Sequence, residues 1–387
     1  MKTKKILRRT ALGVVSLALV FGCQSLEEEQ PLTQNDMGGG GTDVVLASVL
    51  AIEYDLANDN YYAVGASPSG DIDVYYGSQG AGWTKLQENR DIDNRYSPTE
   101  FKGIAFGANT GKFGNNIALG YGNKDGMGTS INGRLFSDKP YFGDGRPEQI
   151  GTLVEVLTIE YDGDNDNYIA VGVGPEGSID VYVGYHKAWT KLQENRDIDN
   201  RYSPSQFVGI AFGGQGGNFG IGIGNIPNYT IGFRQTAPRA TSINCREFYD
   251  KPYFGDGRPE AIEDGDEYLV RAFAVQYNAA NDKYVVVGEG KNGDIDVFVG
   301  THKNWTKLQE NRDIDNRYSA NEFVDFSIGG DGALQFGVAV GNKILDVNPL
   351  NGANNVDLQQ RGTSINARLF SGNPYFGDGA PRIIGVE

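Results

Sequence analysis

One fifteen-residue segment, WTKLQENRDIDNRYS, occurs three times in this chain without a single difference. The copies begin at Trp83, Trp189 and Trp305. An identical segment that returns at a nearly constant spacing marks an internal repeat, and this repeat is about three times as long as a common helical repeat. The spacing predicts three repeats, at residues 44–153, 154–266 and 267–387.

Each repeat divides into two halves, and each half has four short runs of β-branched and aromatic residues between Gly-, Asn- and Asp-rich turns. In the first repeat the runs cover residues 48–55, 61–65, 71–77 and 83–87, then 101–107, 115–122, 128–136 and 140–144. Six four-stranded units in tandem predict an all-β fold, a six-bladed β-propeller across residues 44–387. Closing the ring leaves only short, protected sheet edges. The alternative is three tandem β-sandwich domains.

The first residues precede the repeats and have the composition of a targeting segment. A basic start is followed by an apolar run at residues 11–21, which is too short for a stable membrane span. The run ends in Val20-Phe21-Gly22-Cys23, which resembles the lipobox of bacterial lipoproteins. The resemblance implies that residues 1–22 are a signal peptide and that Cys23 is acylated, which anchors the chain in a membrane. The alternative is an ordinary secretory signal with an incidental cysteine.

Residues 23–43 are polar, acidic and glycine-rich, which predicts a flexible tether. We therefore expect a lipoprotein of the bacterial envelope, held at the outer membrane on its periplasmic or cell-surface side. Loss of the five positive charges of the signal peptide takes the formal charge from −16 to −21, and a chain this acidic has no basic surface for nucleic acid. We expect a monomer, with Cys245 as a small buried thiol in the place of Gly133 and Ala367.

The strand, turn and tryptophan around Trp83 together resemble the Asp-box repeat of sialidase-like β-propellers. The segment from Ser78 to Trp83 lacks the aspartate of that box, and Tyr185 and Thr301 stand in place of its serine in the other repeats. The resemblance implies a propeller architecture, and sialidase activity does not follow from it.

The sequence ENRDIDNRYS is predicted to connect the outer strand of one blade to the inner strand of the next. We expect it to share one face of the propeller with the sequence GDGRPE, at Gly143 and Gly255, and with loops of unequal length at residues 123–128, 225–240 and 342–362. Loops on a rigid scaffold are where binding residues usually lie.

The repeated segment offers three equivalent candidate sites for a ligand. Arg and Asn suit hydrogen bonds to hydroxyls or carboxylates, and Tyr suits stacking, so glycans are the first ligand class to consider. The alternative is a structural latch, because Asp and Asn stabilise turns and Arg–Asp pairs lock crossovers. The candidate ligand-binding residues are Arg90, Asp91, Asp93, Asn94, Arg95, Tyr96, Arg196, Asp197, Asp199, Asn200, Arg201, Tyr202, Arg312, Asp313, Asp315, Asn316, Arg317 and Tyr318.

Other polar residues have a structural interpretation beside a functional one. Calcium at Asp91 and Asp93 is the one cofactor alternative; otherwise we expect no cofactor and no metal. The sequence YDGDNDNY at Tyr161 favours a hairpin turn over a calcium loop. Aspartate is depleted in strands, so the Asp of each IDV motif should pair with a nearby Lys or Arg. The three tryptophans favour core packing over sugar stacking. Arg134, with Arg246 and Arg368, would contact an acidic ligand or a carboxylate of the next blade.

Signatures of known enzyme classes are absent from the sequence, with no GxSxG, HExxH or Walker motif. The two histidines, His186 and His302, stand at equivalent places that have no His in the first repeat. The sequence therefore predicts a non-catalytic binding or adhesion module at the envelope, with multivalent glycan binding as the first hypothesis. The alternatives are a glycoside hydrolase with one pocket near the propeller axis, or a structural envelope protein.

Overall fold

A computed structural model describes one compact unit from Asp43 to Glu387. The described residues are 45–387 except 79–81, 87–91, 108–115, 137–138, 193–197, 214–217, 232–234, 248–251, 280, 309–313, 333–334, 347–356, 371–372 and 386–387. Within these ranges no helix has the length and apolarity to span a bilayer. The residues predicted as signal peptide and tether, with Cys23, lie outside the described part.

The first three blades are four-stranded antiparallel sheets. Blade 1 contains β1 (Ser48–Asp55), β2 (Asn60–Ala66), β3 (Ile72–Ser78) and β4 (Gly82–Lys85). Blade 2 contains β5 (Phe101–Phe106), β6 (Asn116–Lys124), β7 (Met127–Phe136) and β8 (Lys139–Gln149). Blade 3 contains β9 (Glu155–Asp162), β10 (Asn167–Val173), β11 (Ile179–Tyr185) and β12 (Ala188–Lys191).

The other three blades follow the same order, with one extra strand in blade 5. Blade 4 contains β13 (Phe207–Phe212), β14 (Asn218–Ile231), β15 (Gln235–Glu247) and β16 (Pro252–Ala261). Blade 5 contains β17 (Glu263–Asp264), β18 (Glu267–Asn278), β19 (Lys283–Gly290), β20 (Ile295–Thr301) and β21 (Asn304–Lys307). Blade 6 contains β22 (Phe323–Gly332), β23 (Gln335–Asp346), β24 (Leu358–Phe370) and β25 (Asn373–Ile383).

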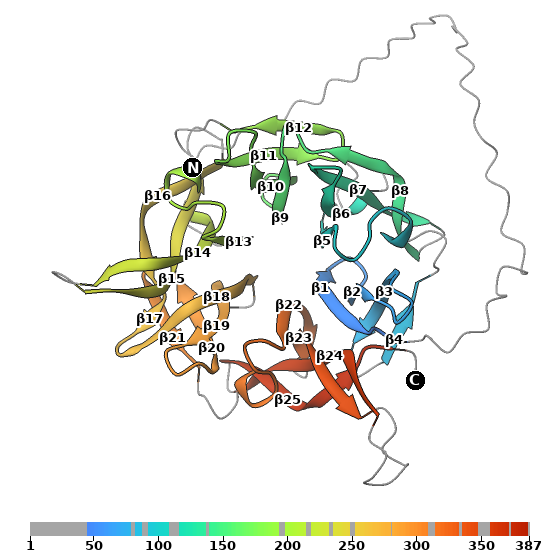
Figure 1. The fold of residues 1–387 in the computed structure, drawn as a ribbon. Coiled ribbons are helices and arrows are strands. Elements are labelled where there is room, and N and C mark those ends of the chain that lie inside the picture. Colours follow the sequence, from blue (N-terminus) through green and yellow to red (C-terminus); the bar gives the residue numbers. More distant parts are fainter. Residues whose placement is uncertain are drawn as a thin grey trace, which may run out of the picture. The chain divides into compact units, whose positions relative to one another are not determined.

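The six blades close into a ring around a central axis (Figure 1). The innermost strands β1, β5, β9, β13, β18 and β22 contact one another in succession, and β22 returns to β1. At this seam Val45 forms a bridge with Gly385, and the Leu46 amide donates to the Ile384 carbonyl at 2.9 Å. The predicted six-bladed propeller is confirmed. Independent sandwiches are wrong, because every blade buries its faces against its neighbours.

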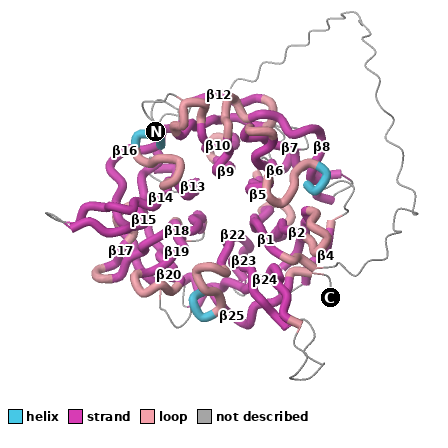
Figure 2. Tube along the Cα trace, viewed as in Figure 1, coloured by secondary structure: helices cyan, strands magenta, loops and turns pink. Residues whose placement is uncertain are grey.

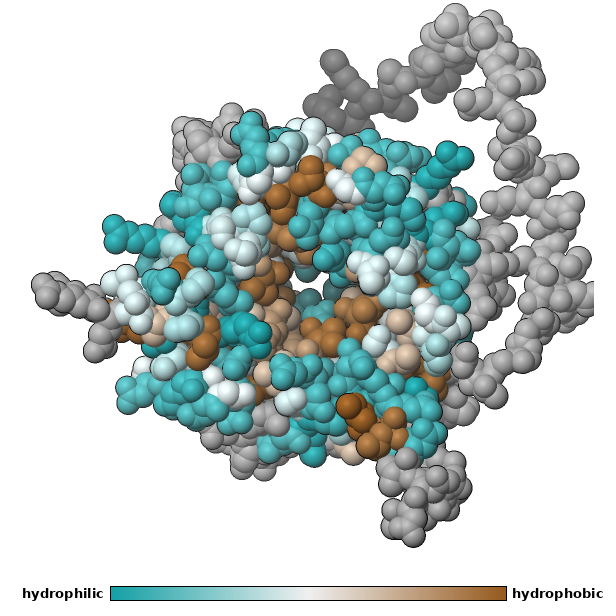
Figure 3. Space-filling view, in the orientation of Figure 1, coloured by the Kyte–Doolittle hydropathy of each residue, from teal (hydrophilic) through white to brown (hydrophobic). Residues whose placement is uncertain are grey.

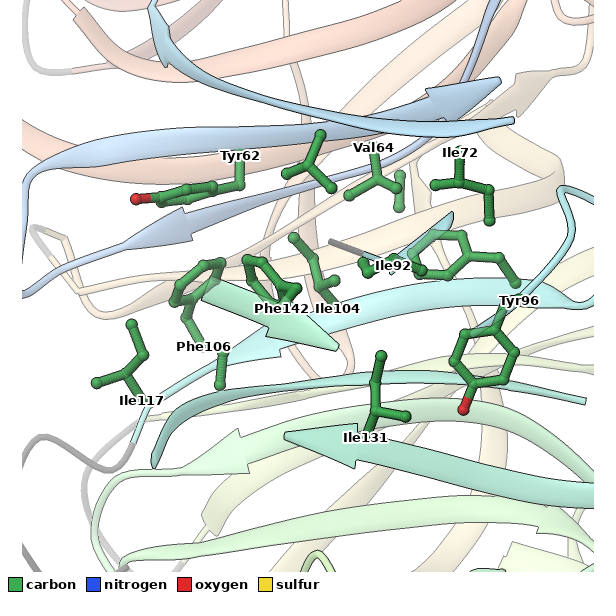
Figure 4. Packing of buried hydrophobic residues seen from close by; sticks show 14 residues of the cluster. Tyr62, Val64, Ile72, Ile92, Tyr96, Ile104, Phe106, Ile117, Ile131 and Phe142 are labelled. Carbon is green, nitrogen blue, oxygen red and sulfur yellow. The ribbon is translucent and has the colours of Figure 1, made fainter. Parts of the chain in front are cut away.

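The hydrophobic core is divided into six clusters, one at each contact between blades. Side chains along a strand alternate between two faces, so one blade supplies apolar residues to both neighbours. Between blades 1 and 2, Tyr62 stacks on Phe106 at 4.7 Å between ring centroids, and Phe106 meets Phe142 edge-on at 5.7 Å. Figure 4 shows this packing, with Ile92 and Tyr96 beside it. The ring is thus held by interfaces that no single blade completes.

An asparagine links the end of each repeat to the start of the next. The side chain of Asn123 accepts from the Val156 amide at 2.7 Å and donates to the Val156 carbonyl at 3.4 Å. Asn225 makes the same pair of bonds with Ala272. Asn342 makes it with Val49, across the seam that closes the ring. The side-chain amide thus makes the pair of hydrogen bonds by which a neighbouring strand would join the two sheets.

Two predictions about loops are wrong. The sequence GDGRPE lies inside β8 and β16 rather than in a connection, because a bulge between the partners of Ser130 and Asn132 absorbs its glycines. The loops predicted at 225–240 and 342–362 are extended hairpins of β14–β15 and β23–β24. Their first strands continue to Ile231 and Asp346, so strand pairing extends into both predicted loops, whose tips at 232–234 and 347–356 lie outside the described residues.

Candidate functional sites

The centre of the repeated segment forms a short 3₁₀ helix that packs between two blades. The three copies are η2 (Ile92–Asn94), η4 (Ile198–Asn200) and η6 (Ile314–Asn316), spaced around the ring in Figure 2. The isoleucine that opens each helix is fully buried in the cluster between the two blades that the segment connects. A single apolar residue in a polar loop therefore fixes the loop to the core.

The tyrosine of each copy is also buried. The hydroxyl of Tyr96 lies 2.9 Å from Oγ1 of Thr129, which donates in turn to the Gly122 carbonyl. The equivalent pairs, Tyr202 with Thr241 and Tyr318 with Thr363, are both 3.0 Å apart. Gly122 makes room for the ring, because a Cβ there would lie 3.0 Å from ring atoms of Tyr96.

Burial raises the pKa of all three tyrosines, so the hydroxyls stay protonated. Their rings are at most 2% exposed. A covered ring cannot stack on a sugar at the surface, and the expectation that these three tyrosines form a stacking platform is wrong. They hold the segment against the next blade instead.

The remaining predicted site residues lie nearer the surface or outside the described part. Asp93, Asn94 and Arg95 and their described copies Asp199, Asn200, Arg201, Asn316 and Arg317 are partly or fully exposed. The main chain of the segment is held by a neighbouring lysine, since Lys124 donates to the Arg95 carbonyl at 2.5 Å and Lys343 to the Arg317 carbonyl at 2.9 Å. Outside the description lie Arg90, Asp91, Arg196, Asp197, Arg312, Asp313 and the side chain of Asp315.

A second set of polar residues gathers where one repeat meets the next. Ser130 and Asn132 on β7 stand opposite Tyr121 and Leu119 on β6. Directly opposed residues share a sheet face, and both β6 residues pack in the cluster that contains Trp189 of blade 3. Ser130 and Asn132 therefore face the tryptophan across the contact between blades 2 and 3.

The same arrangement returns at the other two contacts between repeats. Ser242 and Asn244 oppose apolar residues that pack with Trp305, and Ser364 and Asn366 oppose residues that pack with Trp83. We call these sets the junction clusters. Their members are Ser130, Asn132, His186 and Trp189 between blades 2 and 3; Ser242, Asn244, His302 and Trp305 between blades 4 and 5; and Ser364, Asn366 and Trp83 between blades 6 and 1.

Several polar atoms of the junction clusters are buried without a hydrogen-bond partner among the described residues. They are Nε1 of Trp83, Trp189 and Trp305, Oδ1 of Asn132 and Asn366, and Oγ of Ser364. A buried polar group that lacks a partner costs about 1–3 kcal/mol. Folded proteins keep few such groups, and they concentrate where a water or a ligand binds. The unpartnered indole N–H recurs at all three contacts, and an unpartnered asparagine oxygen occurs at two of them, in Asn132 and Asn366.

Histidine and lysine close two of the junction clusters on the outside. His186 Nδ1 lies 3.2 Å from Ser130 Oγ, and His302 Nδ1 lies 3.0 Å from Ser242 Oγ. The next residue, Lys187, pairs with Glu148 of the neighbouring blade at 3.6 Å between charged atoms, and both side chains are about half exposed. A charged pair at the surface therefore directly follows the buried His186 in the chain. The sequence signal was the threefold recurrence of TSIN and WTK, which stand about 60 residues apart at the first two junctions and at opposite ends of the chain at the third.

Other sequence predictions are resolved inside single blades. Trp83 and Trp305 are buried in the core as predicted, and Cys245 is a fully buried thiol whose pKa is raised by burial. The YDGDNDNY sequence is a hairpin turn in which Asp162 accepts from the Asp164 amide at 3.1 Å. The IDV aspartates pair with the WTK lysines of the same blade: Lys85–Asp73 at 2.8 Å, Lys191–Asp180 at 2.9 Å and Lys307–Asp296 at 2.9 Å.

Arg134 contacts an aromatic ring of its own blade. Its guanidinium lies 5.5 Å from the centre of the Tyr141 ring, on the strand that pairs with its own. Side chains of Arg246 and Arg368 are outside the described part. Across the described ranges, no group of three His, Cys, Asp or Glu residues is arranged to hold a metal ion.

No family model matches this sequence, and no curated protein matches it. Among solved structures it is similar to the fucose-specific lectin from Aleuria aurantia, with a TM-score of 0.51 and 12% identity over 89% of this chain and 99% of the lectin. SapL1 lectin in complex with alpha methyl fucoside has a TM-score of 0.47 and 10% identity over 89% and 97%. The PQQ-bound aldose sugar dehydrogenase from Streptomyces coelicolor has 0.43 and 10% over 83% and 95%.

These similarities concern the fold. All of them span most of both chains at 12% identity or less. The shared feature is the propeller. Ligands and activities named for those proteins do not pass to this chain through so distant a likeness.

Proposed function

We propose that this protein is a non-catalytic, multivalent glycan-binding module of the bacterial envelope. The observation that carries the proposal is the junction cluster, which sets an unpartnered indole N–H at three equivalent blade contacts and an unpartnered asparagine oxygen beside it at two of them. These atoms are covered in this structure, so a sugar reaches them only when the side chains above them move aside. An indole N–H donates, and an amide or hydroxyl oxygen accepts. A sugar hydroxyl does both, so it complements this combination better than a purely cationic or anionic ligand does.

The charge of the chain supports a neutral glycan rather than an acidic one. The formal net charge is −16 for the whole sequence, and a strongly negative protein repels anionic ligands. The described junction residues carry no fixed charge of their own. The likeness in fold to the fucose-specific lectin from Aleuria aurantia makes neutral sugars such as fucose the first ligands to test.

Three equivalent sites make weak individual binding sufficient. Linked sites engage a repeated ligand with an effective concentration in the millimolar range for short connections, and overall avidity then exceeds single-site affinity by about 10²–10⁴. The partly exposed Arg95, Arg201 and Arg317 form a second threefold set, which we propose as an alternative location for the same ligand. The two sets lie at different blade contacts, so mutations separate them.

The test is a glycan array with the soluble Cys23→Ser protein and two triple variants. Asn132→Ala/Asn244→Ala/Asn366→Ala removes the junction amides, and Arg95→Ala/Arg201→Ala/Arg317→Ala removes the exposed arginines. Because the Asn132 and Asn366 oxygens have no partner in the described protein, we expect the first variant to keep its melting temperature and to lose binding. The second variant should keep binding.

Each other outcome has a defined meaning. Binding that is lost only in the arginine variant would move the site to the repeated segment. Wild-type protein that binds nothing on the array would contradict glycan recognition and favour a structural envelope protein. Turnover of an array glycan would place the glycoside hydrolase alternative first.

We also propose that Cys23 carries the lipid anchor of an outer-membrane lipoprotein. The support is the sequence Val20-Phe21-Gly22-Cys23 after a basic and apolar start, followed by a polar, glycine-rich tether. Replacing Cys23 with Ser should move the protein from the membrane fraction to the soluble fraction, because anchoring needs the acylated thiol. Unchanged fractionation of Cys23→Ser would show that the anchor is elsewhere.

A further inference from the structure

The propeller has a cavity on its axis, independent of the junction clusters. It has a volume of about 210 Å³ and is lined by residues of all six innermost strands. Figure 3 shows the central opening of the ring, with apolar residues along part of its rim. Apolar residues such as Leu50, Leu157 and Phe273 form much of the lining of this narrow space, so an ionised group among them is poorly solvated and costly.

Three carboxyl groups from three different blades line this cavity. They belong to Glu53 on β1, Glu160 on β9 and Asp325 on β22. Asp325 also spans the ring-closing seam, since it accepts from the Phe326 amide at 2.8 Å and from the Ile52 amide of blade 1 at 3.5 Å. No blade contains two of these acids, so their mutual repulsion acts between blades.

The other polar groups at the cavity leave this charge uncompensated. Lys102 on β5 lines the cavity, and its ammonium lies 3.8 Å from Glu155. Tyr121 on β6 has a pKa raised by burial and by the charge of Glu160, so its hydroxyl is neutral. Gln276 on β18 occupies the position of Glu53 and Glu160 in the third repeat and is also neutral. The residues that β13 contributes to the lining, 208–210, carry no charge.

The surroundings favour the protonated form of each acid. Burial, and then the charge of Asp325, raises the pKa of Glu160 from 4.5 to about 8. Burial raises the pKa of Asp325 to about 7 against the hydrogen bonds from Phe326 and Ile52. Burial, Glu160 and Asp325 together raise the pKa of Glu53 well above its ordinary value.

We propose that Glu53, Glu160 and Asp325 form a proton-dependent clamp on the propeller axis. When they are protonated, three neutral groups occupy the cavity and the inner strands stay packed. When they ionise, like charges on blades 1, 3 and 6 repel one another and the ring loosens. The third repeat carries Gln276 at the position equivalent to Glu53 and Glu160, so the lining of the cavity has three acids.

The direction of the pH effect follows from the raised pKa values. A carboxyl that binds its proton more tightly in the folded state stabilises the fold fully below its unfolded pKa of about 4.5, and this stabilisation is lost as pH rises through the folded pKa. Each such group changes the unfolding equilibrium constant by about tenfold per pH unit between these limits. Stability should therefore fall from mildly acidic pH toward about pH 8.

The test compares urea unfolding of the wild-type chain, Glu53→Gln/Glu160→Gln and the control Glu176→Gln, from about pH 5 to about pH 9. Glutamine at these positions is what the third repeat carries, and Glu176 lies exposed on a turn. The double variant should lose about a tenfold dependence per pH unit for each acid removed, while Glu176→Gln follows wild type. Parallel curves for all three proteins would overturn the proposal.

Infrared spectroscopy gives a second measurement, which needs only the wild-type chain and one single variant. The wild-type chain at about pH 6 should show a protonated-carboxyl band that is lost near pH 9 and is weaker in Glu160→Gln. If the double variant does not fold, this band decides. Its absence from the wild-type chain at pH 6 would show that the axial acids are ionised and would refute the clamp.

Discussion

At the scale of single residues, each repeat buries a charged pair inside a blade. The aspartate of IDV was expected to find a cationic partner because aspartate is unfavourable in strands, and the lysine of WTK is that partner in all three copies. The sequence indicated this pair because both residues recur at fixed distances. It could not indicate the partnerless atoms of the junction clusters, since these depend on the meeting of two repeats.

Breaking one such pair should be costly. Lys307 is 8% exposed and Asp296 is 5% exposed, with 2.9 Å between their charged atoms. Asp296→Ala removes one of the two carboxylates that pair with the buried Lys307 ammonium, and Glu267 remains at 3.1 Å. The free energy of unfolding should fall by about 1–3 kcal/mol. The exposed pair Lys187–Glu148 is the control, and Lys187→Ala should cost less than about 1 kcal/mol. Equal losses in urea unfolding would mean that burial does not set the cost.

At the scale of elements, the repeated segment is held to the propeller by its buried isoleucine and tyrosine. The sequence was ambiguous because Asp, Asn and Arg serve turns and ligands alike. Ile92, the one apolar residue among polar ones, anchors the segment by packing between blades 1 and 2. The sequence of the segment alone could not show this, because the space that Ile92 fills is formed by two different blades. Strand positions were predictable from alternation, whereas the hairpin extensions to Ile231 and Asp346 were not, because their polar residues read as loop.

The latch can be weakened without removing its ring. Tyr318→Phe keeps the buried aromatic ring and deletes the hydroxyl that meets Thr363 at 3.0 Å. The free energy of unfolding should fall by about 1 kcal/mol, since Thr363 keeps its bond to the Gly341 carbonyl. Tyr318→Phe/Thr363→Val should cost less than the sum of the single variants if the two hydroxyls act together. Full additivity in urea unfolding would contradict that coupling.

At the scale of the whole molecule, stability comes from closing the ring. A fragment that ends after Arg201 contains blades 1 to 3 and leaves the outer faces of blades 1 and 3 uncovered, including Ile169 and Val171 of the next cluster. It should aggregate or remain unfolded, because each blade completes its core only with two neighbours. A soluble fragment with a cooperative thermal transition, seen by circular dichroism, would mean that repeats fold independently.

The seam of the ring has the same geometry as a junction inside the chain. Inside the chain, the Leu153 amide donates to the Ile150 carbonyl at 3.0 Å, and Gly151 and Thr152 connect the two residues. At the seam, the Leu46 amide donates to the Ile384 carbonyl at 2.9 Å, and no such connection joins them. The position of the chain ends is therefore interchangeable among the repeats. A circular permutant that joins Ile384 to Leu46 through Gly-Thr, and opens between Gly151 and Thr152, should fold to the same ring.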